Sequence, residues 1–284
     1  MPKIKIVTDS TAFLEEEVLE RYGIEVVPLY VNFADETIKD GSIDNATYFH
    51  KLMHSAEVPT TSQPSAGDFA RVFERLINSG HEVVAILISS GISGTVESAR
   101  AAAKMIAPAR ISVVDSLSTA GGLALLVLAA ARAAQEGKDR EEIRALLADL
   151  KGRLKVFFVP ASLKFLKKGG RIGGAQALLG TLLQIKPLLY FSGGKIEVFD
   201  RVRTMKKALA RLVNELPATS EGLELFLMNA ESGANIQRLK ELILQRLPGL
   251  PIKTYEISPV IATHVGPVAG LAFIRQTQNT VPGV

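Results

Sequence analysis

Hydroxyl side chains gather in the short stretch PTTSQPS, which spans residues 59–65. It contains Thr60, Thr61, Ser62 and Ser65 but no acid, base or cysteine. Neutral hydroxyls are weak catalysts by themselves, yet each can donate and accept hydrogen bonds. The stretch therefore indicates that a ligand is held rather than transformed.

Three more polar segments follow predicted strands of the first half of the chain. They are TDST (8–11), SSGISGT (89–95) and DSLST (115–119). Ligands of open α/β sheets bind outside the carboxyl ends of the strands. Each segment alone is also explained by ordinary helix N-capping. Together with PTTSQPS, the three segments favour a binding site at this edge.

The segment Gly91-Ile92-Ser93-Gly94-Thr95 raises the alternative of a serine hydrolase. A nucleophile elbow has the pattern G-x-S-x-G, and here Thr95 stands where the last glycine belongs. His264 is the candidate base, but a suitable chain order does not establish a catalytic triad. The pattern leaves the hydrolase as a weaker alternative.

A glycine-rich stretch, LKKGGRIGG (166–174), precedes a long uncharged run. It lacks the spacing of a P-loop, so a turn before an apolar helix is the simpler interpretation. Arg171 lies between its glycines, where the guanidinium needs an anionic or polar partner. His264 lies in the mostly apolar PVIATHVGPVAG, where a satisfied core histidine is the simplest interpretation.

Composition narrows the function classes. The absence of cysteine excludes disulfides, thiol nucleophiles and Cys-ligated zinc, and with only four histidines we expect neither a metal site nor a cofactor. A net charge of +4 without Trp argues against nucleic-acid binding. Neither uncharged run, 116–131 or 172–185, reaches the roughly 20 residues that span a bilayer. No secretory signal precedes the first strand, so we expect a cytoplasmic protein.

Periodicity in the first half predicts alternating strands and helices. Near-continuous apolar strands in such an alternation are typical of a parallel sheet covered on both faces. The predicted strands are 3–7, 24–33, 82–89 and 109–115, of which 24–33 is bulged or interrupted. The predicted helices are 14–22, 66–79, 95–106, 118–136 and 140–151.

The pattern changes after residue 152. A hairpin around SGG (192–194) and irregular alternation predict a mixed sheet. We therefore expect an α/β protein of two domains, 1–152 with a parallel sheet and 153–284 with a mixed sheet. The predicted strands are 155–160, 187–191, 195–200, 223–228 and 252–257, and helices are expected after residues 172 and 205 and over 235–247.

Seven motifs in one order resemble the DegV family of bacterial fatty-acid-binding proteins, which includes the lipid-binding (FakB-like) subunits of fatty acid kinase. They are TDST, PTTSQPS, ISSGISGT, the pair Asp115-Ser116, LKKGGRI, the R-x-R-x-x-K-K-A of 201–208, and THVGP. The resemblance covers essentially the whole chain. It implies an N-terminal α/β/α domain and a C-terminal mixed-sheet domain, a fold shared with dihydroxyacetone kinase subunits.

The resemblance also implies a ligand and its site. One long-chain fatty acid would lie with its tail buried and its carboxylate held by Thr61 and Ser93. Arg171 and His264 would complete the polar network, and Ser62, Gly94 and Thr95 belong to the same motifs. Such a chain is not catalytic alone, because a separate ATP-binding kinase subunit makes the acyl phosphate for phospholipid synthesis. The resemblance places docking of that partner at Arg201, Arg203 and Lys207.

Energetics divide the roles of tail and head. A 16-carbon acid buries about 14 methylenes at about 0.8 kcal/mol each, or about 11 kcal/mol before costs. We expect the uncharged runs 116–131 and 172–185, with Phe157 and Phe158, to line the tail tunnel, although simple core packing explains them equally well. One departure from the family pattern is the missing glycine after Pro267, which puts the aim of His264 in question.

Three alternatives to a kinase-linked carrier remain. A serine hydrolase would use Ser93 as its nucleophile. A small-carbonyl phosphotransferase subunit would bind dihydroxyacetone covalently through a histidine. A lipid sensor or buffer would hold the same fatty acid with no kinase partner.

Overall fold

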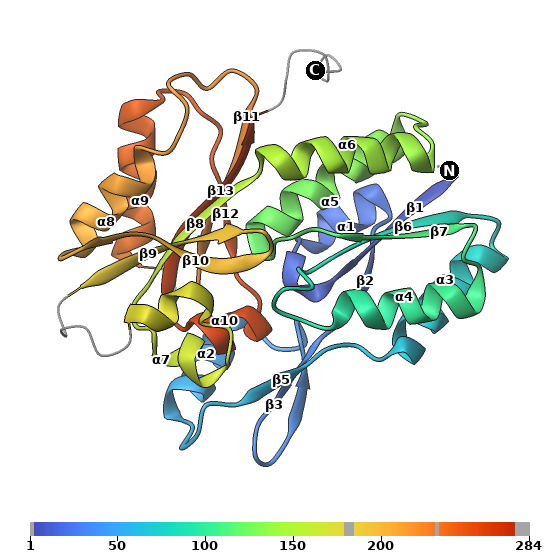
Figure 1. Cartoon of the computed structure of the whole chain (residues 1–284), viewed down its shortest axis with the longest axis horizontal. Coiled ribbons are helices and arrows are strands. Elements are labelled where there is room, and N and C mark those ends of the chain that lie inside the picture. The colour runs from blue at the N-terminus through green and yellow to red at the C-terminus, as the bar shows by residue number, and fades with distance from the viewer. Residues whose placement is uncertain (1–2, 179–184, 231–232, 276–284) are drawn as a thin grey trace.

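Two β-sheets form the body of the molecule, as Figure 1 shows. The computed structural model describes residues 3–178, 185–230 and 233–275. Sheet A is parallel throughout, with the order β2-β1-β6-β7. Its strands are β1 (Ile4–Asp9), β2 (Glu25–Val27), β6 (Glu82–Leu87) and β7 (Ile111–Asp115).

Helices cover both faces of sheet A, as the strand composition predicted. Alternate residues of β6 serve the two sides: Val83 and Ala85 pack with α3 and α4, whereas Val84 and Ile86 pack with α5. The helices of this half are α1 (Glu16–Tyr22), α3 (Ala66–Asn78), α4 (Thr95–Ile106), α5 (Ala120–Gln135) and α6 (Arg140–Arg153).

Sheet C is mixed and has the order β10-β9-β8-β13-β11-β12. Only the β11–β12 pair is parallel. Helices α8 (Met205–Val213) and α9 (Ala234–Arg246) cover the face that points away from sheet A. The strands are β8 (Lys155–Pro160), β9 (Lys186–Ser192), β10 (Lys195–Val202), β11 (Leu223–Asn229), β12 (Lys253–Glu256) and β13 (Val268–Arg275).

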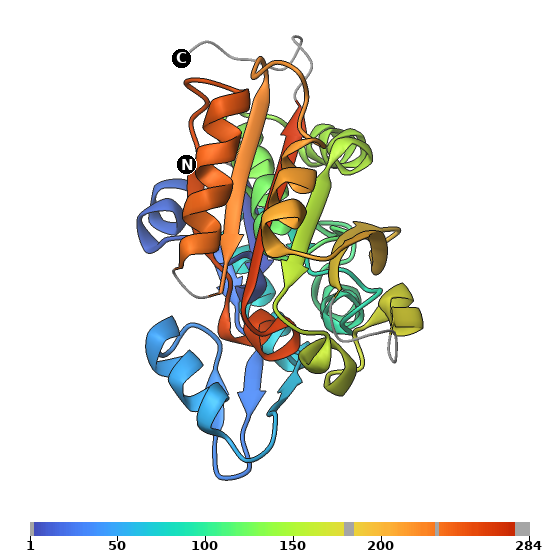
Figure 2. The same cartoon turned by 90° about the vertical axis from the view of Figure 1, so that its left-hand side faces the viewer.

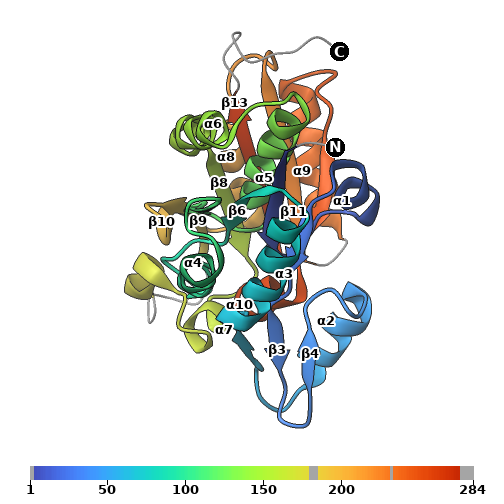
Figure 3. The same cartoon turned by 90° about the vertical axis from the view of Figure 1, so that its right-hand side faces the viewer.

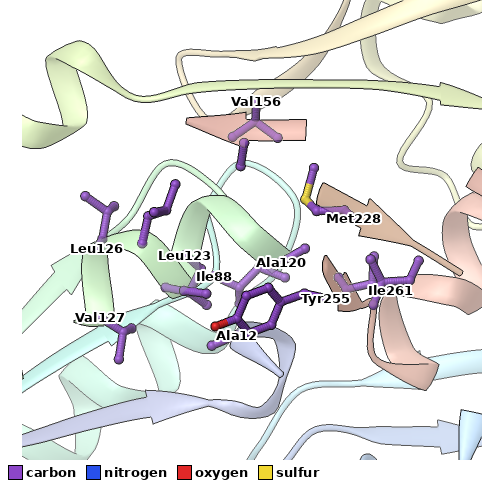
Figure 4. Packing of buried hydrophobic residues seen from close by; sticks show 14 of the residues in the cluster. Ala12, Ile88, Ala120, Leu123, Leu126, Val127, Val156, Met228, Tyr255 and Ile261 are labelled. Atoms are coloured by element: carbon purple, nitrogen blue, oxygen red, sulfur yellow. The ribbon is translucent and has the colours of Figure 1, made fainter. Parts of the chain in front are cut away.

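Helix α5 lies between the two sheets and is buried on nearly every side. Its side chains join residues of both sheets in one apolar cluster, part of which Figure 4 shows. An all-round apolar helix is expected in such a position. Sheet A lies wholly before residue 152 and sheet C wholly after it, while this cluster contains residues from both. The two-domain division at that residue stays a prediction.

A small third sheet, B, projects at one end of the molecule together with α2 (Figures 2 and 3). The strand expected over 24–33 is interrupted, and the interruption is a change of sheet: the chain turns after Val27 and enters sheet B instead of continuing in sheet A. PTTSQPS was assigned to no predicted strand, yet its middle is a strand paired with β3. The elements are β3 (Tyr30–Asn32), β4 (Thr37–Lys39), β5 (Thr60–Ser62) and α2 (Asn45–His54).

The hairpin around residues 192–194 is confirmed, with Gly193 and Gly194 both at positive φ. The apolar helix expected after residue 172 is different: residues 173–178 form a 3-10 helix, and 179–184 lie outside the described residues. The remaining short elements are η1 (Ser10–Ala12), α7 (Lys164–Lys168), η2 (Gly173–Leu178) and α10 (Pro259–Val265).

Candidate functional site

One cavity of about 370 Å³ opens where sheet C, the carboxyl edge of sheet A, β5 and α10 meet. Pockets for small organic ligands typically measure about 300–1,000 Å³. Most of its wall is apolar, and its polar side chains come from segments far apart in the sequence. These polar residues are Thr61, Ser62, Gln63, Ser93, Thr119, Arg171 and His264.

The apolar wall includes one row of residues across sheet C. Gly270 of β13 pairs with Phe158 on one side and with Met228 on the other, and all three line the cavity. A Cβ on Gly270 would lie 2.7 Å from the carbonyl oxygen of Phe157, so the row requires a glycine there. Figure 4 shows Met228 and Val156 near Ala120 at the start of α5.

Only some of the residues expected to line a tail tunnel line this cavity. Phe158 lines the cavity, but its neighbour Phe157 points to the opposite face and packs against Tyr190 and Phe199. Of the run 116–131 only Thr119 and Ala120 reach the cavity, because the rest of α5 is core. Among the described residues of 172–185, none lines it.

Thr61 and His264 are brought together from opposite ends of the sequence. Thr61 Oγ1 lies 2.8 Å from His264 Nε2. Burial of the imidazole lowers the pKa of His264 to about 4, and the positive charge of Arg171 adds to this effect. The ring is therefore neutral near pH 7. Its Nδ1 is buried with no hydrogen-bond partner among the described residues.

Helix α10 holds His264 through contacts with the first half of the chain. Ser258 caps the helix, and Asp40 accepts a hydrogen bond of 3.1 Å from the Val260 backbone N–H. The hydroxyls of Tyr48 and Thr263 bond to each other. Burial raises the pKa of the Asp40 carboxyl, which also accepts from Ser10. With these constraints His264 faces Thr61 although the glycine after Pro267 is absent.

Ser93 lies in the turn between β6 and α4. Its Oγ is 2.8 Å from Thr95 Oγ1, and Ser93 lines the cavity while Gly94 and Thr95 do not. Thr95 is buried at the first position of α4. Gly94 provides space, since a Cβ there would lie 2.3 Å from the amide oxygen of Gln63. Gly94 and Thr95 therefore shape the turn that presents Ser93.

Arg171 joins the two halves at the cavity mouth. Its Nε donates to the carbonyl of Ile92 at 3.2 Å, and its Nη1 donates to that of Gly169 at 2.6 Å. The side chain is exposed, so solvent screens its charge in part. The polar partners expected for this guanidinium are thus backbone carbonyl oxygens. One of them, that of Ile92, lies on the strand-to-helix turn that carries Ser93.

Five of the seven predicted ligand-binding residues line the cavity, whereas Gly94 and Thr95 do not. Thr61, Ser62, Ser93, Arg171 and His264 share the cavity, and Ser62 Oγ accepts a hydrogen bond from Asn32. Gln63 was not predicted, and neither was the apolar wall apart from Phe158 and Ala120. Gln63 lies within PTTSQPS. The rest of the wall comes mainly from α10 and from strands of sheet C, where no sequence pattern distinguishes a cavity wall from core.

Arg201, Arg203 and Lys207 lie apart from this cavity, at the end of β10 and the start of α8. All three side chains are exposed. None forms an ion pair with another residue in the described ranges. Their cationic groups are thus available at one surface.

Two negative findings apply to the described part of the chain only. Within residues 3–178, 185–230 and 233–275, no three or more His, Asp or Glu side chains gather as a metal site would require. In the same ranges no helix is both long and apolar enough to cross a membrane.

Comparison with known proteins identifies relatives of a single family. The chain matches the model of the DegV family, whose description reads "Uncharacterised protein", over residues 3–276. A DegV domain-containing protein of Clostridium acetobutylicum is 37% identical over 283 residues, which cover 96% of this chain and 98% of that protein.

Solved structures of related proteins resemble this chain over nearly its whole length. The fatty-acid-binding DegV family protein of Thermus thermophilus has a TM-score of 0.89 and 36% identity, covering 97% of this chain and 100% of that one. DegV of Bacillus subtilis, described as a fatty acid binding protein, has a TM-score of 0.86 and 29% identity over 97% of this chain and 100% of its own.

Proposed function

The chain belongs to the DegV family, and on this premise we propose that it binds one long-chain fatty acid in the cavity between its sheets. One observation carries the proposal: a single cavity combines a mostly apolar wall with several hydrogen-bonding side chains. An amphiphile with one acidic end matches both parts. The fatty acids that its structural neighbours bind have this chemistry.

The donors suit a carboxylate. The hydroxyls of Thr61 and Ser93 can each donate one O–H to its oxygens, and such bonds to an anion are short and strong. His264 Nε2 accepts from Thr61 or donates to it, depending on which ring nitrogen carries the proton. Arg171 at the mouth adds positive charge without occupying the cavity floor. The head group is thereby held without covalent chemistry.

The wall supplies most of the affinity. Burial of about 14 methylenes is worth about 11 kcal/mol before the costs of association, whereas each bond to the charged head contributes about 1.5–3 kcal/mol. Loss of one head-group donor therefore weakens binding without abolishing it. Loss of the tail abolishes it.

The test is a titration of delipidated protein with palmitate. Ser93→Ala is expected to raise the dissociation constant about tenfold or more. Ser90→Ala is the matched control, since Ser90 lies in the same turn but bonds to Asp115 outside the cavity. Equal affinities for the wild type and Ser93→Ala would refute the assignment of Ser93.

The second part of the proposal concerns a partner. We infer a carrier that presents its lipid to a separate ATP-dependent kinase subunit in the cytoplasm, which docks at Arg201, Arg203 and Lys207. The double variant Arg201→Glu/Arg203→Glu is expected to keep its palmitate affinity and lose acyl phosphate formation with the kinase subunit of the same organism. Undiminished product formation would refute the docking surface.

Other functions predict different results. A Ser93 hydrolase would be labelled by a fluorophosphonate, yet the Ser93 hydroxyl pairs with Thr95 and His264 pairs with Thr61. A phosphotransferase subunit would form a covalent adduct with dihydroxyacetone at a histidine. A lipid buffer would bind palmitate but yield no acyl phosphate with any ATP-binding partner.

A further inference from the structure

Gln63 lines the fatty-acid cavity, but its side chain forms its hydrogen bond across the cavity edge to another segment. The residue directly follows β5, the strand that contains Thr61. Its Nε2 donates a hydrogen bond of 3.1 Å to Ser98 Oγ in the first turn of α4. That helix begins directly after the turn that contains Ser93. The side chain therefore bridges the two segments that carry Thr61 and Ser93.

The backbone of Gln63 is held on both sides. Before it, β5 pairs with β3 in sheet B. After it comes Pro64, and a residue that precedes proline is restricted to extended backbone. The next residue, Ser65, caps α3 in a capping box. The amide at the end of the side chain can therefore hold β5 in a fixed position, because the backbone between them has little freedom.

Gly94 provides the surface on which this amide lies. A Cβ on Gly94 would lie 2.3 Å from Oε1, 2.6 Å from Nε2 and 2.8 Å from Cδ of Gln63. The backbone of Gly94 (φ −80°, ψ 8°) is accessible to alanine as well, so its conformation does not require a glycine. The contact with the amide does require one, since any larger residue would displace the amide.

This contact acts on the turn that presents Ser93. Gly94 lies between Ser93 and Thr95, whose hydroxyl oxygens are 2.8 Å apart. The other end of the bridge begins two residues after Thr61. The hydroxyls of Thr61 and Ser93 have to reach the oxygens of one carboxylate, and an O–H···O bond is lost when its length grows beyond about 3.5 Å. A shift of β5 relative to the turn would therefore weaken at least one of the two bonds.

We propose that Gln63 is a positioning residue for the fatty-acid carboxylate. Its amide joins the end of β5 to the start of α4 and thereby fixes the distance between the hydroxyls of Thr61 and Ser93. The inference rests on the proposed function, because Gln63 acts through the two hydroxyls that hold the head group. The neutral amide makes this link without placing a negative charge beside the carboxylate.

The test is a calorimetric titration of delipidated protein with palmitate and with its methyl ester. Gln63 is exposed, so Gln63→Ala leaves the core unchanged. This variant is expected to raise the dissociation constant for palmitate about threefold to tenfold, the effect of one neutral hydrogen bond, and that for the ester by about twofold at most. Equal losses for acid and ester would overturn the proposal, since they would show a general change of the cavity.

Gln135→Ala is the matched control. Gln135 is also exposed, and its Nε2 also donates a hydrogen bond of 3.1 Å, in this case to the carbonyl of Arg21 outside the cavity. The control should leave both affinities unchanged. A loss of palmitate affinity equal to that of Gln63→Ala would contradict a specific role of Gln63.

Gly94→Ala disturbs the same amide from the opposite side. The new Cβ displaces the amide of Gln63, so the loss of palmitate affinity should match that of Gln63→Ala. The double variant should lose no more than either single variant, because the amide is already absent. Additive losses would contradict the proposal, since they would show that the two residues act independently.

The same titrations separate this inference from the proposed function. Wild-type protein that binds no palmitate would refute the proposed function, and the inference with it. Wild-type protein that binds palmitate, loses affinity in Ser93→Ala and keeps it in Gln63→Ala would overturn the inference alone.

Discussion

Replacing Thr61 with valine removes one hydroxyl and keeps the shape of the side chain. In the structure this hydroxyl lies 2.8 Å from His264 Nε2 and lines the fatty-acid cavity. The variant therefore loses a donor to the carboxylate and leaves the imidazole without its partner. The apolar wall, which carries the tail, stays intact.

The size of the effect follows from these contacts. A hydrogen bond to a charged group contributes about 1.5–3 kcal/mol, so the dissociation constant for palmitate should rise about 10- to 150-fold. The tail retains its roughly 11 kcal/mol of gross burial energy, so measurable binding remains. The methyl ester of palmitate has no carboxylate, and its affinity should change far less.

The assay is calorimetric titration of delipidated protein with palmitate and with its methyl ester. Thr60→Val is the matched control, because Thr60 belongs to the same strand but is exposed and outside the cavity. A loss of affinity in Thr61→Val that is equal for acid and ester would show that the cavity is distorted. It would refute the role of Thr61 as a head-group donor.

Three further predictions concern the surroundings of this contact. Ile261→Val removes one methylene from the wall and should weaken acid and ester alike by up to about fourfold, since a methylene is worth about 0.8 kcal/mol; selective loss for the acid would contradict this. Gly169→Ala should weaken palmitate binding as strongly as His264→Ala, because the new Cβ would lie 2.1 Å from His264 Nδ1, whereas Gly152→Ala, with nothing within 4 Å, should have no effect. The pKa of His264 is about 4 in the folded state and about 6.5 unfolded, so between these values the unfolded chain binds more protons and stability falls as the pH falls. His264→Gln removes this loss of stability, so the melting temperature of the variant minus that of the wild type should be larger at about pH 5 than at about pH 7. A difference that does not change with pH would refute the lowered pKa.

Asp9 changes the folding stability in the opposite direction over part of the same pH range. Burial raises the pKa of the Asp9 carboxyl to about 6, although the hydrogen bonds that it accepts from Thr11 and from the Ile88 backbone N–H act in the opposite direction. Between about pH 4 and 6 the folded state holds more protons at Asp9 than the unfolded chain, so stability rises as the pH falls there. The comparison of His264→Gln with the wild type cancels this contribution.

Local patterns predicted sheet A and most strands of sheet C, but not β13 (Val268–Arg275), which lies between β8 and β11. Alternation of strand and helix predicted sheet A, and the SGG turn predicted the β9–β10 hairpin, since both patterns consist of residues that are neighbours in the sequence. The strands of sheet B have only three residues each, too few for a period of two to be visible. Helix α10 is buried on all faces except near His264, so it lacked the polar stripe that marks an amphipathic helix.

The sequence predicted only those site residues that stand together in a short motif. Hydroxyl-rich motifs pointed to Thr61 and Ser93, but only the fold brings β5 next to α10 and sets Thr61 against His264. Strand alternation requires that Phe157 and Phe158 face opposite sides. It does not tell which side holds the cavity, because that depends on the position of α5.

The central claim is a fatty acid with its carboxylate at Thr61 and Ser93 and its tail inside the molecule. Native mass spectrometry of the protein, purified without added lipid, tests it most directly. The account predicts one dominant species heavier than the polypeptide by a single long-chain fatty acid, released on denaturation. Bare polypeptide alone, which also fails to take up palmitate when it is added, would contradict the account.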